Sequence, residues 1–571
     1  MNQMKPRRSG GRAARKAMRA APLAEDLRPI RAGLSGGCYA PLSDADIARI
    51  HEAALTVLEE IGLADAPPSG VEIMTRAGAI LGDDGRLRYP PALVEDMLAK
   101  AGRDITLHGR EERYDLHLSG KKVHYGTAGA AVNMVEADGR TYRHSTLQDL
   151  YDAARITDQL DNVHFFQRPM VARDLTDNRE LDLNTIYASC TGTTKHVGTS
   201  ISEPDNAQDC VDLCYAIAGG EEAFRARPFV SNTNCFVVPP LKFATESCEA
   251  METCIRGGLP VLLLSAGMAG ATAPATLAGA IVQAVAECLA GMVYVNALVP
   301  GHPAVFGTWP FVVDLRTGAM SIGSGEQALL TAGCAQMHHF YGLPGGAAAG
   351  ASDAKLPDMQ AGWEQMCTNL MAGLGGLNMV YEAAGMHASL LGFCHESLIL
   401  GDDIIGQALR CVKGIEVTDE TLAIEAMREV CLGGPGHYLG VGDTLARMET
   451  DYVYPAFGDR TSPKEWEELG KLELVENAAK RKADILAQPS RAALDRETDR
   501  AIRLGFPIKL LVAPPWASHT RGASPRHPPE YFRTKNDCGP PPRQATGRPA
   551  IPGHGHRRYR LCRWFSIGDH G

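Results

Sequence analysis

Two acids and a lysine follow a run of very small residues in the segment GLPGGAAAGASDAKLPDMQAG, residues 342–362. Ser352, Asp353 and Lys355 come directly after Ala351, where the chain has almost no side-chain bulk. Reactive and ligand-binding side chains in enzymes are often carried on loops that leave a rigid strand. An acid in such a loop can hold or balance a positively charged substrate. The segment therefore raises the possibility of a cation site.

Polar and aromatic residues also stand at the ends of short apolar runs elsewhere: Arg168, Asn232, Asn234, Trp309, Tyr381 and Glu382. Acids beside aromatic rings suit a cationic substrate, because an ammonium over a Trp or Tyr face gains roughly 0.5–2 kcal/mol. Each aromatic residue, including Phe236, has the alternative of being ordinary core. Asp353 has the alternative of a loop cap, and Glu382 that of a salt-bridge partner.

Several familiar catalytic motifs do not occur in this sequence. It has no GxSxG, HExxH or phosphate-loop pattern, and none of its 15 cysteines forms a CxxC pair. We expect free, buried thiols, a reducing cytoplasm and no metal site. The net charge of −10 argues against nucleic acid as a partner. The longest apolar stretch, 259–298, is interrupted by polar residues, so we expect a buried strand and helix and no membrane span.

Eight short apolar runs alternate with longer amphipathic stretches between residues 123 and 413. The runs are 123–129, 163–172, 196–201, 229–238, 260–270, 304–313, 343–352 and 378–386. Eight strands separated by helices predict an α/β fold, a TIM-type (β/α)₈ barrel with helical additions at both ends. An open doubly wound sheet is the alternative, although GTAGAA at 126–131 lacks its glycine fingerprint. In a barrel, the residues named above lie at the carboxyl ends of the strands.

The remaining chain divides by composition. We predict a basic disordered arm at 1–27, a helical region at 28–122, the barrel at 123–413, a helical extension at 414–505 and a disordered or aberrant tail at 506–571. The seventh run, rich in Gly and Ala, predicts either a cavity inside the barrel or space filled by bulky neighbouring strands.

Long motifs in this order resemble the trimethylamine methyltransferase family. They include YAPLSDADIARIHEAALTVLEEIG, VDLRTGAMSIGSGEQAL, FYGLPGGAAAGASDAKLPDMQAGWEQ, HESLILGDDIIG, GGPGHYLG and VYPAFGDRTSPKEW, and the resemblance covers roughly residues 28–490. It implies a (β/α)₈ barrel that transfers a methyl group from a methylated amine to the Co(I) corrinoid of a partner protein. No tightly bound cofactor is then expected, since the partner supplies the cobalamin. We also expect a homo-oligomer.

The sequence departs from the archaeal trimethylamine enzymes where these carry pyrrolysine, because the matching residue is Ala351. The resemblance therefore favours the pyrrolysine-free branch, whose substrates are quaternary amines such as glycine betaine, over trimethylamine. On this reading Asp353 and Glu382 balance the ammonium as catalytic residues. The predicted substrate-binding residues are Arg168, Asn232, Asn234, Trp309, Ala351, Ser352 and Tyr381. A non-catalytic quaternary-amine binding barrel and a barrel lyase on a related substrate are the alternatives.

Overall fold

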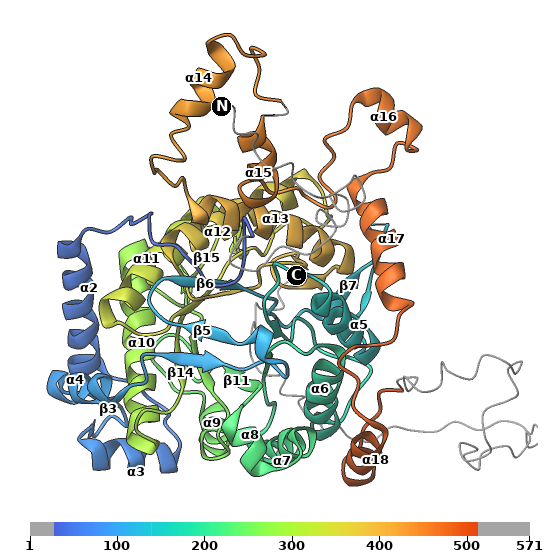
Figure 1. The fold of residues 1–571 in the computed structure, drawn as a ribbon. Coiled ribbons are helices and arrows are strands. Elements are labelled where there is room, and N and C mark those ends of the chain that lie inside the picture. The colour runs from blue at the N-terminus through green and yellow to red at the C-terminus, as the bar shows by residue number, and fades with distance from the viewer. Residues whose placement is uncertain (1–27, 139, 440, 512–571) are drawn as a thin grey trace, which may run out of the picture. The chain divides into compact units, whose positions relative to one another are not determined.

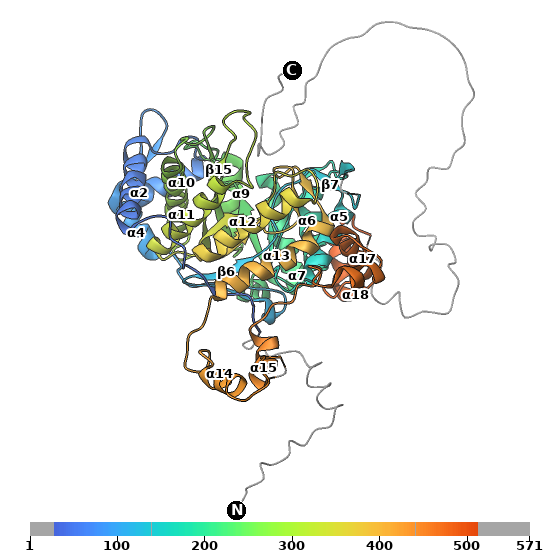
Figure 2. The same ribbon diagram turned by 90° about the horizontal axis from the view of Figure 1, so that it is seen from above.

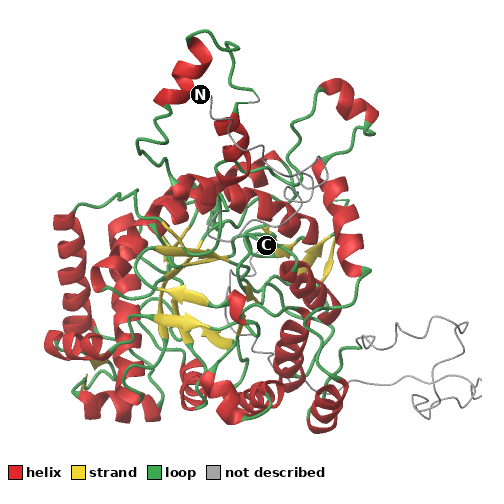
Figure 3. Ribbon diagram, viewed as in Figure 1, coloured by secondary structure: helices red, strands yellow, loops and turns green. Residues whose placement is uncertain are grey.

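The structure, a computed structural model, describes residues 28–511 apart from positions 139 and 440 (Figure 1). The predicted arm at 1–27 and most of the predicted tail, 512–571, lie outside the described residues. Within the described part, strands lie in the interior and helices surround them (Figure 3). This arrangement buries apolar strands on both faces, as parallel sheets require.

Eight parallel strands overlap the eight predicted runs in order. They are β6 (Lys122–Tyr125), β9 (Phe166–Gln167), β10 (Val197–Thr199), β11 (Val230–Asn234), β12 (Val261–Ser265), β14 (Ala304–Thr308), β16 (Gly346–Ala348) and β17 (Met379–Tyr381). One sheet has the order β14-β12-β11-β10-β9, and a second contains β6-β17-β16, with every one of these neighbours parallel. Single parallel bridges, Gly126 to Phe165 and Phe306 to Gly345, connect the edges of the two sheets. The predicted parallel α/β architecture is confirmed.

Helices connect these strands. They are α5 (Leu147–Asp158), α6 (Asn178–Gly192), α7 (Ala207–Ala218), α8 (Glu221–Ala226), α9 (Thr245–Arg256), α10 (Leu277–Leu298), α11 (Gly325–Tyr341), α12 (Met359–Gly375) and α13 (His395–Lys413). Seven of them match predicted helices, but α6 and the short α8 were missed. Most of α6 is buried, including Asp182 and Asn184, so its sequence shows no apolar stripe from which a helix could be inferred.

The N-terminal helices pack onto the same core as the strands. α2 (Asp44–Thr56), α3 (Pro68–Ala77) and α4 (Pro91–Lys100) share one hydrophobic cluster with α10 and with Leu263 of β12. Ser43 caps α2 in a reciprocal capping box with Asp46, as its position before the apolar pattern predicts. In length and composition α10 is the one described helix that could span a membrane, but most of it is buried among these elements (Figure 2).

The loops that leave the carboxyl ends of the parallel strands contain short additional strands. β7 (Asn133–Val135), β8 (Tyr142–His144), β18 (Met386–His387) and β19 (Gly392–Phe393) form one small sheet, and β13 (Met268–Ala269) pairs with β15 (Phe311–Val312). Three further pieces precede β6: β1 (Leu34–Ser35), the hairpin β2 (Ile80–Leu81) and β3 (Leu87–Arg88), and the hairpin β4 (Ile105–Leu107) and β5 (Leu116–Leu118). Pairing of β19 with β7 joins the loop after β17 to the loop after β6.

Five helices follow α13: α14 (Ile424–Cys431), α15 (Gly442–Thr450), α16 (Pro463–Glu468), α17 (Leu474–Leu486) and α18 (Arg496–Gly505). The segment after α18 does not separate from the fold at Phe506 as predicted. The side-chain oxygen of Asn184 accepts hydrogen bonds from the backbone of Lys509 and Leu510, and its amide donates to the carbonyl of Pro507. The compact unit extends to Leu511. The other predicted domain boundaries stay predictions.

Candidate functional site

Glu382 is a buried acid at the carboxyl end of β17. Only 1% of its surface is exposed, and neither carboxyl oxygen has a hydrogen-bond partner among the described residues. Its backbone is left-handed, with φ at 63°, a conformation that residues with a side chain rarely adopt. Burial raises the pKa of Glu382 to about 8. An acid held in this way gains most from a positively charged group brought next to it.

Three aromatic rings converge on the residue before Glu382. The ring of Tyr381 lies 5.0 Å from that of Trp309 and 5.1 Å from that of Phe165, measured between centroids. The indole nitrogen of Trp309 is buried and has no hydrogen-bond partner among the described residues. Phe165 was not among the predicted site residues, although one of the two adjacent phenylalanines in VHFFQRPMVA must face inward if the segment is a strand. Trp309 and Tyr381, two of the predicted substrate-binding residues, therefore lie together.

Phe236 does not join this aromatic group. Its ring lies 6.3 Å from that of Phe243, in the cluster between the strands and α10. A β-carbon added to Gly291 of α10 would lie 2.7 Å from the Phe236 ring, which shows how closely the ring meets that helix. Of the three aromatic residues considered from the sequence, Phe236 is core, and only Trp309 and Tyr381 lie together.

The glycines of the small-residue run let neighbouring groups approach. A β-carbon on Gly346 would lie 2.7 Å from the ring of Tyr381 and 3.3 Å from Val305, so neighbouring strands fill this position. A β-carbon on Gly350, where φ is 82°, would lie 2.5 Å from the side-chain nitrogen of Asn369. At Gly346 the space is therefore filled by neighbouring strands, which is the alternative that the sequence left open. The absence of a side chain at Gly346 leaves room for the ring of Tyr381. Ala351, later in the run, is fully buried.

Asp353 and Ser352 fasten loops together. The Asp353 carboxylate accepts hydrogen bonds from the backbone of Ile322 at 3.1 Å and Gly323 at 3.2 Å, and from the hydroxyl of Ser389 at 2.7 Å. These donors come from the loops after β14 and β17, so Asp353 ties the loops of three consecutive strands. Burial raises the pKa of Asp353. This geometry favours the alternative of a loop cap over the predicted role as counter-ion to an ammonium.

Glu364 on α12 anchors the same loop and was missed by the sequence reading. One of its carboxyl oxygens accepts from the Ser352 hydroxyl at 2.6 Å and from the Asp353 backbone at 2.8 Å. The loop in turn supports a strained turn, in which Ala388, Ser389 and Leu390 all have positive φ. No local pattern points to Glu364, which lies six residues after the Asp358 cap of α12.

Asn232 points away from the aromatic group. On the same strand, the Thr233 hydroxyl donates to the side-chain oxygen of Gln167 at 3.0 Å, and Gln167 shares a face with Phe165 two residues earlier. Successive side chains of a strand alternate between faces, so Asn232 faces the surrounding helices. This placement argues against the predicted substrate-binding role of Asn232. The side chain of Asn234 lies outside what the structure describes.

Arg168 is half-buried at the end of β9. Its guanidinium donates to the Ser200 hydroxyl at 3.2 Å and lies close enough to Asp182 of α6 to lower the pKa of that carboxyl, which burial raises overall to about 6. Asp182 is also held by Ser202 and Asn206. Arg168 therefore lies at the strand ends as predicted, and it also lies close to an acid of the surrounding helices, Asp182.

Further buried polar groups occur on the elements next to Glu382. Asn369 of α12 donates to the carbonyl of Ala383 at 2.9 Å, while its own side-chain oxygen has no partner among the described residues. His387 bonds to the Ser397 hydroxyl at 2.7 Å through one ring nitrogen. Burial lowers the pKa of His387 to about 4, so the ring is neutral near pH 7. It cannot neutralise Glu382.

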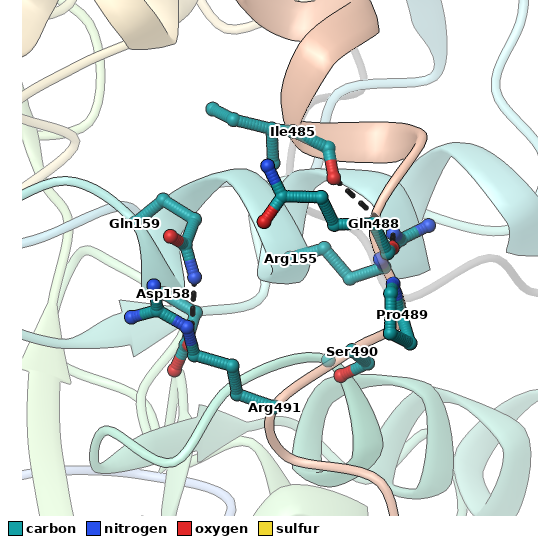
Figure 4. Close-up of a pocket in the computed structure, with 9 residues that line it drawn as sticks. Arg155, Asp158, Gln159, Ile485, Gln488, Pro489, Ser490 and Arg491 are labelled. Atoms are coloured by element: carbon teal, nitrogen blue, oxygen red, sulfur yellow. Dashed lines mark hydrogen bonds between the residues drawn. The ribbon is translucent and has the colours of Figure 1, made fainter. Parts of the chain in front are cut away.

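A cavity of about 240 Å³ lies elsewhere, between the ends of α5 and α6 and the segment that follows α17 (Figure 4). Arg155 crosses one side of it and donates to the carbonyls of Ile485, Leu486 and Gln488. The Ser490 hydroxyl donates to the carbonyl of Thr191 at 2.7 Å. These contacts fasten the C-terminal segment to the outer helices, and the cavity contains none of the predicted site residues.

Comparison with protein families gives a match to the model for trimethylamine methyltransferase (MTTB) over residues 8–507. The chain belongs to this family. One relative is a trimethylamine methyltransferase MttB of Desulfitobacterium hafniense (strain DSM 10664 / DCB-2). It is 30% identical over 80% of this chain and 92% of its own length. A glycine betaine methyltransferase of Desulfitobacterium hafniense (strain Y51) is 30% identical over 81% and 96%. A trimethylamine methyltransferase MttB of Methanosarcina thermophila is 31% identical over 78% and 92%.

Among solved structures, the monomethylamine methyltransferase of Methanosarcina barkeri is similar with 12% identity and a TM-score of 0.43, over 81% of this chain and 90% of that chain. The recognition of the family from the sequence motifs is confirmed by the family match.

Proposed function

We propose that this protein is a methyltransferase that transfers a methyl group from a quaternary ammonium compound to the Co(I) corrinoid of a partner protein. Family membership supports methyl transfer from a methylated amine. The observation that carries the quaternary ammonium is Glu382, a buried carboxyl without a protein partner among the described residues, which directly follows Tyr381 of the Trp309–Tyr381 pair in the chain. A cation is what such a carboxyl and two ring faces bind together.

We also propose that the eight parallel strands close into a (β/α)₈ barrel. The support is the pair of bridges at the sheet edges, with hydrogen bonds from His164 to the carbonyl of Tyr125 at 2.6 Å and from Phe306 to the carbonyl of Pro344 at 2.8 Å. In such a barrel Tyr381 and Glu382 stand at the carboxyl end, where (β/α)₈ enzymes have their active sites.

The chemistry favours a quaternary over a tertiary amine. Methyl transfer breaks a carbon–nitrogen bond, and the electron pair of that bond stays on nitrogen as the methyl moves to cobalt. A quaternary ammonium then leaves as a neutral amine, whereas a free tertiary amine would first have to become cationic. At the position where pyrrolysine occurs in the archaeal trimethylamine enzymes, this chain has Ala351, which cannot form a bond to an amine.

The part played by the protein is orientation and electrostatics. Glu382 and the ring pair would hold the ammonium so that one methyl points out of the strand ends, while the corrinoid of the partner supplies the nucleophile. If the substrate is a betaine, Arg168 is the predicted side chain to hold its carboxylate among those that the structure describes, since Asn232 faces the helices. Glycine betaine is therefore the first substrate to test.

The test is a cobalamin assay with purified protein. Free Co(I) cobalamin is mixed in turn with glycine betaine, carnitine, choline and trimethylamine, and its methylation is followed by absorbance. We expect methylation with one quaternary amine, little with trimethylamine, and a large loss in Glu382→Gln. Activity restricted to trimethylamine would overturn the proposal. Tight binding of a quaternary amine without methylation would indicate a binding protein.

A matched control is Glu287→Gln. Glu287 is a buried acid of α10 whose pKa burial raises to about 7, but its oxygens accept from Ser265, Gln283 and the backbone of Leu241. Like Glu382 it is a buried glutamate, but it is not one of the candidate site residues. Equal losses in both variants would mean that general damage, and not the missing counter-ion, explains the effect.

A further inference from the structure

Asn369 is a buried amide in the interior of α12. Asparagine is a poor residue for such a position, because its side chain competes for backbone hydrogen bonds. Its side-chain nitrogen donates to the carbonyl of Ala383 at 2.9 Å, and Ala383 directly follows Glu382 in the chain. The hydroxyl of Tyr125 on β6 donates to the backbone carbonyl of Asn369 at 3.0 Å, which fixes this turn of the helix against the strands. Asn369 therefore reaches from a fixed helix to the backbone beside Glu382.

The backbone at Glu382 departs from strand geometry. Its φ of 63° costs roughly 1–3 kcal/mol in a residue with a side chain, which surrounding contacts must offset. The carbonyl of Tyr381 accepts from the amide of Ala349 at 2.9 Å, and the amide of Ala383 donates to the carbonyl of Gly126 at 2.9 Å. Both of these bonds join the main chains of neighbouring strands. The bond from Asn369 is made by a side chain, so a substitution can remove it without removing the strand pairing.

Gly350 lies directly against the bond between Asn369 and Ala383. Its φ is 82°, and a β-carbon there would lie 2.5 Å from the side-chain nitrogen of Asn369 and 2.6 Å from the carbonyl oxygen of Ala383. The amide of Gly350 donates to the hydroxyl of Thr368, the residue before Asn369, at 2.8 Å. The turn after β16 therefore packs onto this bond, and a hydrogen bond enclosed by protein is stronger than one in water.

We propose that Asn369 is a positioning residue, which holds the turn at Glu382 so that the carboxyl group stays away from protein donors and remains available to a cationic substrate. This inference rests on the proposed function. A buried carboxyl gains from any donor within reach, so one that has no partner among the described residues must be held by its backbone.

Stability alone does not explain an asparagine at this position. The side-chain oxygen of Asn369 is buried and has no hydrogen-bond partner in the part of the chain that the structure describes. An unpaired buried oxygen costs about 1–3 kcal/mol, which is comparable to the gain from the bond to Ala383. What the side chain adds is the fixed position of the carbonyl that follows Glu382.

The first readout is the infrared band of the protonated Glu382 carboxyl, which needs no ligand. The spectrum of wild type minus that of Glu382→Gln at pH 6 isolates this band, because burial raises the pKa of Glu382 to about 8. A carboxyl C=O without a donor absorbs at a higher frequency than one that accepts a hydrogen bond. In the Asn369→Ala background, with Asn369→Ala/Glu382→Gln as its reference, we expect the band at lower frequency. It should also titrate away about one pH unit below wild type.

The second readout is the binding of glycine betaine or choline, measured by isothermal titration between pH 6 and 9. We expect Asn369→Ala to bind about tenfold more weakly at pH 8, and its affinity to level off about one pH unit lower than that of wild type. These two shifts belong to the Glu382 carboxyl, and a general loss of stability would not produce them.

Asn378→Ala is the matched control. Asn378 is also a buried asparagine, and its amide donates to the carbonyls of Gly120 at 2.9 Å and Lys122 at 3.0 Å. It directly precedes β17, whereas Glu382 directly follows it, so the two residues lie at opposite ends of one strand. Asn378→Ala should lower the melting temperature and leave the infrared band, the affinity and its pH dependence unchanged.

The outcomes separate this inference from the proposed function. A band that moves in Asn369→Ala, while wild type binds neither amine, would support the positioning role and count against the proposed function. A band that stays in place, or an equal loss of affinity in Asn378→Ala, would overturn the positioning role. Asn369→Ser takes the place of Asn369→Ala if the alanine variant does not fold. If neither variant folds and Asn378→Ala does, Asn369 serves stability and the inference is wrong.

Discussion

Glu382 makes cation binding depend on pH, and the direction follows from its surroundings. Burial raises the pKa of this carboxyl to about 8 from an ordinary value of 4.5. A quaternary ammonium has no proton to give, so it binds best when Glu382 is ionised. Below pH 8, binding must therefore release the proton of Glu382 to solvent. We expect the affinity for a quaternary amine to rise with pH and to level off above about pH 8.

The size of the effect follows from the ionised fraction. With a pKa of about 8, about 1% of Glu382 is ionised at pH 6 and about half at pH 8, which predicts a roughly 50-fold gain in affinity. The same shift disfavours the folded state at high pH. Because the folded pKa exceeds the unfolded one, the stability contributed by protonated Glu382 is complete below pH 4.5 and is lost as pH rises through 8, on the order of 5 kcal/mol in total.

Isothermal titration with glycine betaine or choline between pH 6 and 9 tests this account. Titrations in buffers of different ionisation enthalpy should show about one proton released per ligand near pH 6.5, following the linkage relation. Glu382→Gln should bind more weakly at pH 8, release no proton, and melt at a higher temperature than wild type at pH 9. Glu287→Gln should keep the pH dependence of binding. A wild-type affinity that is flat from pH 6 to 8 would refute the assignment of Glu382 as counter-ion.

Three other substitutions and a pair of truncations test neighbouring parts of the structure. Trp309→Leu should weaken quaternary-amine binding by about 0.5–2 kcal/mol, measured by titration, because the ring face is lost; unchanged affinity would remove Trp309 from the site. Glu364→Gln should lower the free energy of unfolding by about 1–3 kcal/mol in denaturant titrations, since two loop donors lose a charged acceptor. Asn232→Ala should change stability but not ligand affinity, and a loss of affinity would show that its face was misassigned. Truncation after Leu511 should leave the melting temperature unchanged, whereas truncation after Gly505 should lower it.

The strands could be predicted from the sequence because each is a short apolar run between helix-like segments. Their parallel pairing followed from the alternation alone. α6 escaped this reading, since packing against the C-terminal segment buries even its polar residues, among them Asn184 and Tyr187. A period of 3.6 residues in hydrophobicity predicts a helix that has one solvent-exposed face, and α6 has almost no exposed face.

The proximity of Trp309 and Tyr381 was predictable from the sequence, and the contacts of the neighbouring polar residues were less so. Trp309 and Tyr381 could be placed together because both stand at the carboxyl ends of strands of one parallel set. Whether Asp353 faces a substrate or a neighbouring loop depends on backbone donors from Ile322 and Gly323, which no local pattern encodes. The face of Asn232 depended on the register of β11, and a shift of one residue reverses every side chain of a strand.

The attachment of the last described residues to α6 has a consequence for synthesis on the ribosome. Asn184 meets Pro507 and Lys509, and Ser490 meets Thr191, across sequence separations of 299 to 325 residues. The outer side of α6 therefore stays uncovered until nearly the whole chain has been translated. Contacts of such long range are made late and slow the folding of a domain. We expect the nascent chain to expose this surface to chaperones until residue 511 has left the exit tunnel.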